Sequence, residues 1–159
     1  MKRKMRRQDR LMNFEDAMQL LTKAEFGVLS SVDEVGQPYG VPVNFVYDGD
    51  KSIYFHSASE GHKLDNLKRN PKVCFTIVGD VRVMDWKFTT AYESVILFGV
   101  AKVVEGEEKQ HALNRMALKF SLDYMDKFEN EIERFLQTTS VVKISIEHMS
   151  GKARPYENK

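Results

Sequence analysis

The segment from Tyr54 to Lys63 holds the residues whose types and spacing are best suited to chemistry. It runs from a predicted strand end, through a small polar loop, into a predicted helix start, where free backbone N–H groups can bind an anion. Ser57 adds a hydroxyl donor, Gly61 allows close approach of the backbone, and Lys63 supplies a positive charge to which His62 can add another. The segment therefore predicts a phosphate site, although the same residues are equally typical of a surface loop that caps a helix.

A second feature is Pro42, which lies inside a strictly alternating segment at residues 39–47. Proline has no N–H, so within sheets it occurs at edges, bulges or places where a strand opens. An opened strand would leave the backbone groups of Val43 and Asn44 free to meet the polar edge of a flat ring. An edge strand that blocks aggregation explains the proline equally well.

The elements that must position these residues are mostly strands. Alternation and turn signals predict strands at 26–32, 39–47, 52–56, 72–78, 94–104 and 141–146, helices at 14–23, 61–69, 107–120 and 125–136, and a long loop at 79–90. Short turns between consecutive strands imply antiparallel pairing, and the absence of strand–helix–strand alternation favours a closed or partly closed barrel. We therefore expect a mainly β fold with flanking helices. Several strands are apolar on both faces, which predicts a homodimer.

Composition limits the function classes. The 159 residues fit one domain, and the formal charge of +1 gives no general attraction to nucleic acid or to membranes. Residues 1–10 are basic and are predicted to be a flexible tail. The four histidines and the single cysteine, Cys74, match no zinc spacing, so no metal site is predicted. One cysteine and no signal peptide indicate a cytoplasmic protein.

Several segments, taken in order, resemble a known family. Residues 36–45 look like the second strand of the nitroimidazole-resistance branch of the pyridoxamine phosphate oxidase-like flavoproteins. Residues 54–75 are similar to the next block of that family, and residues 92–101 to its long central strand. The resemblance implies a split β-barrel that binds flavin mononucleotide (FMN), and a homodimer with cofactor sites at the interface.

The resemblance also implies roles for individual residues. The FMN phosphate would be held by Ser57, Gly61, His62 and Lys63. The flavin ring would lie against Val41, Pro42, Val43, Asn44, Phe55 and His56, and the partner subunit would close the site with Tyr92, Ser94 or Lys152. His56 is the candidate catalytic residue, as a proton donor or orienter near the reactive edge of the ring, although a hydrogen-bonded strand-end histidine is an equal alternative.

The implied function is that of an FMN-dependent oxidoreductase. It would take electrons from a nicotinamide or another donor and reduce a small acceptor such as a nitroaromatic. The alternatives are a non-catalytic flavin- or haem-binding protein that stores or senses, a deazaflavin or haem in place of FMN, and an oxidase-like enzyme with another substrate. Vitamin B6 phosphates are not expected as substrates, because His62 replaces the usual phosphate-binding arginine and the oxidase's substrate-binding arginine motif is missing.

Overall fold

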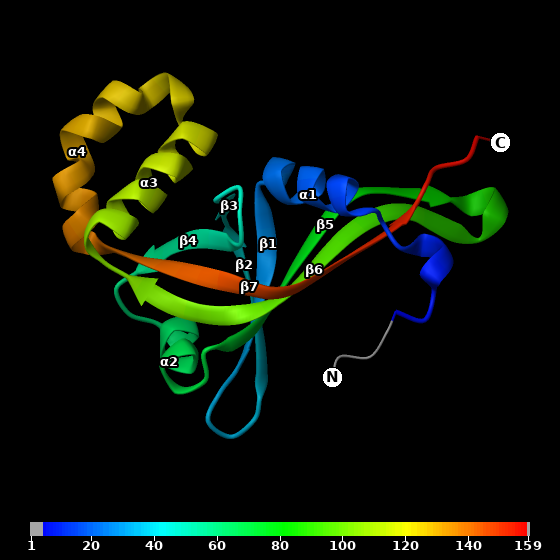
Figure 1. The fold of residues 1–159 in the computed structure, drawn as a ribbon, viewed down its shortest axis with the longest axis horizontal. Helices are drawn as coiled ribbons and strands as arrows, with labels where there is room; N and C mark the ends of the chain where they lie inside the picture. Colours follow the sequence, from blue (N-terminus) through cyan, green and yellow to red (C-terminus); the bar gives the residue numbers. More distant parts are fainter. Residues whose placement is uncertain (1–4, 159) are drawn as a thin grey trace.

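The computed structural model describes residues 5–158, which form one antiparallel seven-stranded sheet flanked by helices (Figure 1). The strands lie in the order β2-β1-β5-β6-β7-β4-β3. Their bounds are β1 Phe26–Val32, β2 Pro38–Asn44, β3 Val46–Tyr47, β4 Ser52–Ala58, β5 Lys72–Met84, β6 Thr89–Val104 and β7 Thr139–Arg154. The predicted mainly β architecture is therefore confirmed.

The helices follow the predicted positions closely. Their bounds are α1 Phe14–Lys23, α2 His62–Arg69, α3 Gly106–Phe120 and α4 Met125–Thr138, and short 3-10 turns lie at η1 Gln8–Arg10, η2 Asp85–Lys87 and η3 Leu122–Tyr124. Asn13 caps α1 by accepting a hydrogen bond from the Asp16 amide, as expected of asparagine at this position. Among the described residues, no helix is long and apolar enough to cross a membrane.

The sheet is strongly curved because its two end strands are consecutive in the chain. The segment predicted as one strand at 39–47 bends at Phe45, so that β2 lies at one end of the sheet and β3 at the other. Phe45 is fully buried, and its amide donates to the carbonyl of Glu25. The sheet thus forms a barrel that is open between its end strands, β2 and β3, rather than closed by a ladder of hydrogen bonds.

The prediction of a loop at residues 79–90 is wrong. β5 continues to Met84 and β6 begins at Thr89, so the segment forms the end of a long hairpin that extends away from the barrel, on the side opposite α3 and α4 (Figure 1). The β5–β6 register shifts between Val78 and Val81. This bulge interrupts the two-residue period and hides the strand from pattern analysis.

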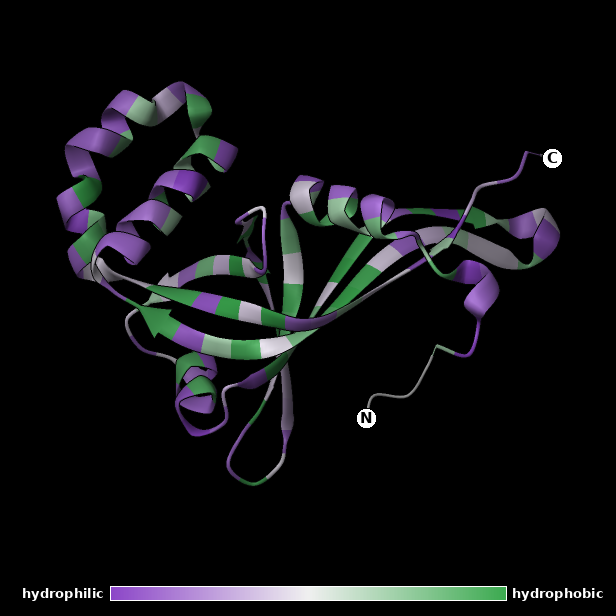
Figure 2. Ribbon diagram, in the orientation of Figure 1, coloured by the Kyte–Doolittle hydropathy of each residue, from purple (hydrophilic) through white to green (hydrophobic). Residues whose placement is uncertain are grey.

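Two apolar clusters hold the elements together. The larger one fills the barrel and includes Ile53 and Phe55 of β4 and Leu20 and Leu21 of α1. The smaller one lies between α3 and the opposite face of β4, which contributes Tyr54. The alternation that separates these faces is visible as alternating colours along the strands in Figure 2.

The start of the described chain is folded rather than extended. Residues 1–4 of the predicted tail lie outside the described residues, but residues 8–10 form η1. Leu11 then forms an isolated bridge to Lys152, and the Met12 amide donates to the Gly151 carbonyl at 3.1 Å. This segment therefore packs along the end of β7.

Candidate functional site at the turn between β4 and α2

The turn from β4 into α2 is built on Gly61. Its φ of 139° lies in a region that L-residues rarely adopt, and a Cβ there would meet no atom within 4 Å. The conformation, rather than crowding, requires glycine, and it leaves the backbone open to an approaching group. Its carbonyl accepts hydrogen bonds from the amides of Leu64 and Asp65, which begins the helix.

Ser57 is the most informative residue of the turn. Its side chain is 93% buried, and its Oγ has no hydrogen-bond partner among the described residues. A buried hydroxyl without a partner costs about 1–3 kcal/mol, so such groups are rare and call for an explanation. A ligand oxygen would supply the missing partner.

The basic residues of α2 complete this end of the site. His62 and Lys63 are its first two residues, where the helix dipole also favours an anion. Gly61 is the N-cap residue of this helix, and no side chain within residues 5–158 makes a capping hydrogen bond to it. The His62 ring meets the ring of Tyr39 edge to face at 4.5 Å, which ties α2 to β2 across the split of the barrel.

The predicted ring-binding residues of β2 divide between two faces. Val41 and Val43 are half-buried and pack against the barrel core, whereas Pro42 and Asn44 are exposed. Asn44 donates to the Glu25 carbonyl at 3.1 Å. β2 is an end strand, so Pro42 lies where a missing N–H is tolerated. A flat ligand on the outside of the barrel would therefore meet Pro42 and Asn44 rather than the two valines.

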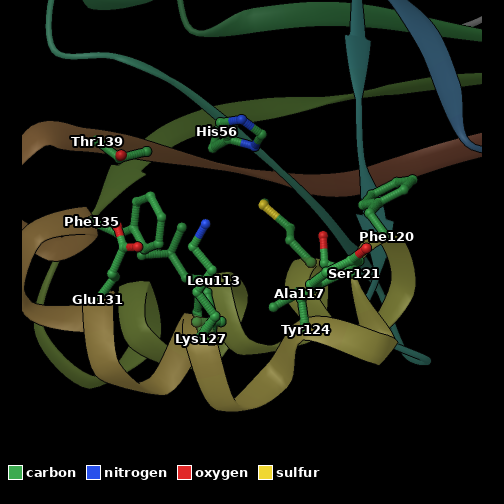
Figure 3. Close-up of a pocket in the computed structure, with 12 residues that line it drawn as sticks. His56, Leu113, Ala117, Phe120, Ser121, Tyr124, Lys127, Glu131, Phe135 and Thr139 are labelled. Carbon is green, nitrogen blue, oxygen red and sulfur yellow. The ribbon is translucent and has the colours of Figure 1, made fainter.

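The predicted site residues of β4 also lie on two different faces of the sheet. Phe55 is fully buried in the barrel core, so its side chain is closed to a ligand. Ser57 lies on the same face as Phe55, whereas His56 points outward beneath α3 and α4 (Figure 3). Partial burial lowers the pKa of the His56 imidazole, and the charge of Lys63 lowers it further. His56 is thus held neutral near the phosphate turn without facing Ser57.

Tyr92, Ser94 and Lys152 form a second group, at the far end of β6 and β7. Ser94 is paired with Lys152 in the sheet, and the Lys152 Nζ lies 5.7 Å from the centre of the Tyr92 ring. Burial alone would raise the pKa of Tyr92, but hydrogen bonds with Lys152 and Arg10 lower it overall. Ser94 and Lys152 line a groove of about 870 Å³.

Within one subunit, the phosphate turn lies far from Lys152 along β7. Phe55 of β4 pairs with Val142, and Lys152 lies ten residues further along β7. That separation is roughly 30 Å of extended strand, more than one FMN molecule can bridge. A shared site would need a second chain.

The sequence interpretation missed a cavity of about 360 Å³ beneath α3 and α4. His56 and Thr139 line it from the strands, and Leu113, Phe128 and Phe135 line it from the helices. The apolar stripe of each helix predicted burial but not an open space, because periodicity does not show how closely two elements pack.

Solved structures with this fold bind flavins in several cases. A candidate 5-nitroimidazole antibiotic resistance protein from Bacteroides thetaiotaomicron is 27% identical over 89% of this chain and 85% of that chain, with a TM-score of 0.74. The flavocytochrome Anf3 from Azotobacter vinelandii is 20% identical over 96% and 73%, with a TM-score of 0.80. An FAD-binding protein from Mesorhizobium loti is 20% identical over 92% and 97%, with a TM-score of 0.64. No curated protein matches.

The family is shown by a match to most of the chain. The family model described as pyridoxamine 5'-phosphate oxidase matches residues 14–153. This match, together with the split-barrel neighbours, confirms the resemblance at the level of the family, whereas the nitroimidazole-resistance branch stays a prediction. The chain belongs to the pyridoxamine 5'-phosphate oxidase family.

Proposed function

We propose that the chain binds FMN with its phosphate at the turn between β4 and α2, and that it uses the flavin to reduce a small acceptor. The observation that carries this proposal is the buried Ser57 hydroxyl, which has no hydrogen-bond partner among residues 5–158 and belongs to the same turn as the open backbone of Gly61. A phosphate oxygen would accept the hydrogen bond of Ser57, Lys63 would balance its charge, and His62 would offer a further hydrogen-bond donor. These residues fit the group that the family implies.

The chemistry would come from the cofactor and the positioning from the chain. The flavin would supply two-electron transfer from a nicotinamide donor to a nitro group, which with two protons gives a nitroso group and water. Pro42 and Asn44 offer an outer surface for the ring. His56, kept neutral by burial and by Lys63, could orient the acceptor by accepting a hydrogen bond or by donating one.

A homodimer would complete this site. Ser94 and Lys152 line a groove large enough for a ring system but lie far from the phosphate turn of their own subunit. A second chain related by a twofold axis would bring its groove to the turn of the first. Val78, Val81 and Val83 on the long hairpin are each more than half exposed and would be covered in such a pair.

The first test is a titration of the purified full-length protein with FMN and with FAD, followed by flavin fluorescence. Lys63→Ala should raise the Kd for FMN by about 10- to 150-fold, the range expected for one lost hydrogen bond to a charged group. Lys68→Ala is the matched control, because Lys68 lies on the same helix but is exposed and faces Asp65. Equal effects of the two substitutions would refute the phosphate assignment.

A second measurement separates catalysis from storage. The flavin-loaded protein is reduced and then mixed with a series of nitro compounds. Reoxidation faster than that of free FMN supports the reductase, whereas equal rates indicate a non-catalytic flavin protein. A visible absorption spectrum of the protein as purified distinguishes flavin from deazaflavin or haem.

A further inference from the structure

The cavity beneath α3 and α4 is separate from the phosphate turn. It lies on the outer face of β4, and its floor is formed by His56 and by Thr139 at the start of β7 (Figure 3). Its volume of about 360 Å³ is near the lower end of the range of small-molecule sites, which is roughly 300–1,000 Å³. The space suits a molecule of one or two rings and is too small for a docked helix or strand.

Most of the wall is apolar and comes from both helices. Leu113 and Ala117 of α3 face Phe128 and Phe135 of α4, whose rings are stacked with centroids 5.7 Å apart. These side chains continue the smaller apolar cluster between α3 and β4. Flat aromatic walls favour a flat aromatic ligand, because offset and edge-to-face ring contacts add to the burial of apolar area.

The polar contact on the floor is the His56 imidazole. Burial lowers its pKa, and Lys63 lowers it further, so the ring is uncharged at neutral pH and offers both a donor and an acceptor. Next to the η3 turn the cavity is lined by Phe120, Ser121 and Tyr124, and Tyr124 is 67% exposed. Lys127 and Glu131 also line the cavity, but their charges are opposite, so the lining has no excess charge that would favour an ionised ligand over an uncharged one.

We propose that this cavity binds a small, uncharged, planar aromatic molecule, held between α3 and α4 with one polar substituent hydrogen-bonded to His56. The binding of this ligand does not require that the protein binds a cofactor. Its further role, as the electron acceptor of the flavin, rests on the proposed function.

The test compares two probes on one ring system, by calorimetric titration of the full-length protein. The first probe is 2-naphthol, which is uncharged and carries one hydroxyl group, and the second is naphthalene-2-sulfonate, which is anionic. We expect 2-naphthol to bind at least 10-fold more tightly. Equal affinities, or no binding of 2-naphthol, would overturn the proposal.

Two neighbouring residues of α3 provide matched variants. Ala117→Phe places a ring into the cavity and should weaken 2-naphthol binding at least 10-fold, whereas Leu118→Phe adds a ring at an exposed position and should change it less than twofold. A melting curve shows whether each variant is folded. If Ala117→Phe does not fold, His56→Leu replaces it and should weaken binding about 2- to 12-fold through the lost hydrogen bond. Unchanged affinity in the folded variant would refute the assignment.

The outcome for the cofactor is measured separately, by the FMN titration described above. Failure of FMN to bind, with 2-naphthol still bound, would refute the proposed function and leave this site in place. If FMN does bind, 2-naphthol should compete with the acceptor that the reduced protein turns over. Absence of competition would overturn the acceptor role.

Discussion

At the scale of single residues, the Ser57 hydroxyl links stability to ligand binding. In the flavin-free protein it is buried without a hydrogen-bond partner among the described residues, so it opposes folding, whereas in the proposed flavin complex it would donate to phosphate. A polar group that destabilises the ligand-free protein but binds the ligand is expected in a binding site.

Ser57→Ala should therefore change two quantities in opposite directions. The flavin-free protein should gain about 1 kcal/mol in the free energy of unfolding, or roughly 2–4 °C in Tm, because the desolvation cost is removed. The affinity for FMN should fall. Ser59→Ala, at an exposed position in the same loop, is the control and should leave both unchanged. A loss of stability in Ser57→Ala would show that the hydroxyl has a partner in the free protein.

The pKa of His56 is a second residue-scale prediction, and NMR titration measures it. Burial is the larger cause of its lowered pKa and Lys63 the smaller, so Lys63→Ala should raise that pKa without restoring its ordinary value of about 6.5. Lys68→Ala should leave it unchanged. If Lys63→Ala leaves the pKa of His56 unchanged, the Lys63 ammonium is too far from the imidazole to influence it.

The lowered pKa of His56 also predicts how the stability of the protein changes with pH. The folded protein holds His56 less protonated than the unfolded chain does, so the unfolded chain takes up more protons as the pH falls below about 6.5. The contribution of His56 to the free energy of unfolding is therefore intact above that pH and declines as the pH drops toward the folded pKa. His56→Gln should flatten this part of the profile of stability against pH, measured by urea unfolding.

The placement of Ser57, Gly61, His62 and Lys63 at one turn could be predicted from the sequence, because they are close along the chain, whereas their role in phosphate binding stays a prediction. The face of the sheet on which each side chain lies was harder to predict from the sequence. Phe55 and His56 are adjacent, yet one fills the barrel and the other lines the helical cavity. In a strand with apolar residues on both faces, the sequence alone does not indicate which side is the interior.

At the scale of elements, α3 is fastened to the barrel by Lys119. Its Nζ donates to the carbonyls of Ala24 at 2.5 Å and Phe45 at 3.2 Å, at the corner between β2 and β3. Burial lowers the pKa of this ammonium, and Glu25 partly offsets the effect. The contact joins α3 to the residue at which the sheet turns back on itself.

Lys119→Met should destabilise the protein by about 1–3 kcal/mol, since both carbonyls would lose a charged donor while the apolar part of the side chain is kept. Lys102→Met, at an exposed position of β6, should change stability by less than about 0.5 kcal/mol. Chemical denaturation of the two variants measures the difference. Equal effects would mean that the link between α3 and the corner contributes little.

Two strand ends that the sequence did not predict share one cause. β5 and β7 both continue past a register shift, between Val78 and Val81 in one case and opposite Phe98 and Gly99 in the other. At the second shift the backbones approach so closely that a Cβ on Gly99 would lie 2.2 Å from the Ser145 oxygen. A bulge reverses the order of inward and outward residues, so alternation counted along the chain stops there even though the strand does not.

At the scale of the whole molecule, the long hairpin bears on assembly. Its exposed valines lie on paired strands rather than in a loop, so they present an ordered surface. If this surface is covered in a homodimer, Val83→Asp should shift the protein toward monomer in size-exclusion chromatography with light scattering. Val35→Asp, in the turn between β1 and β2 and more exposed still, is the control. A monomeric parent protein would contradict the expectation directly.

The position of β7 also affects how the chain folds during synthesis. β7 is the last of the seven strands to be translated, yet it lies between β6 and β4 and joins the two parts of the sheet. Until it emerges, the nascent chain holds one four-stranded piece and one small hairpin, each with an unpaired edge that could pair with another chain. Pairing of β4 with a strand more than 80 residues away is also slow, because a long loop must close first. Yield of the folded protein should therefore depend on growth temperature and on chaperones that shield exposed strands during translation.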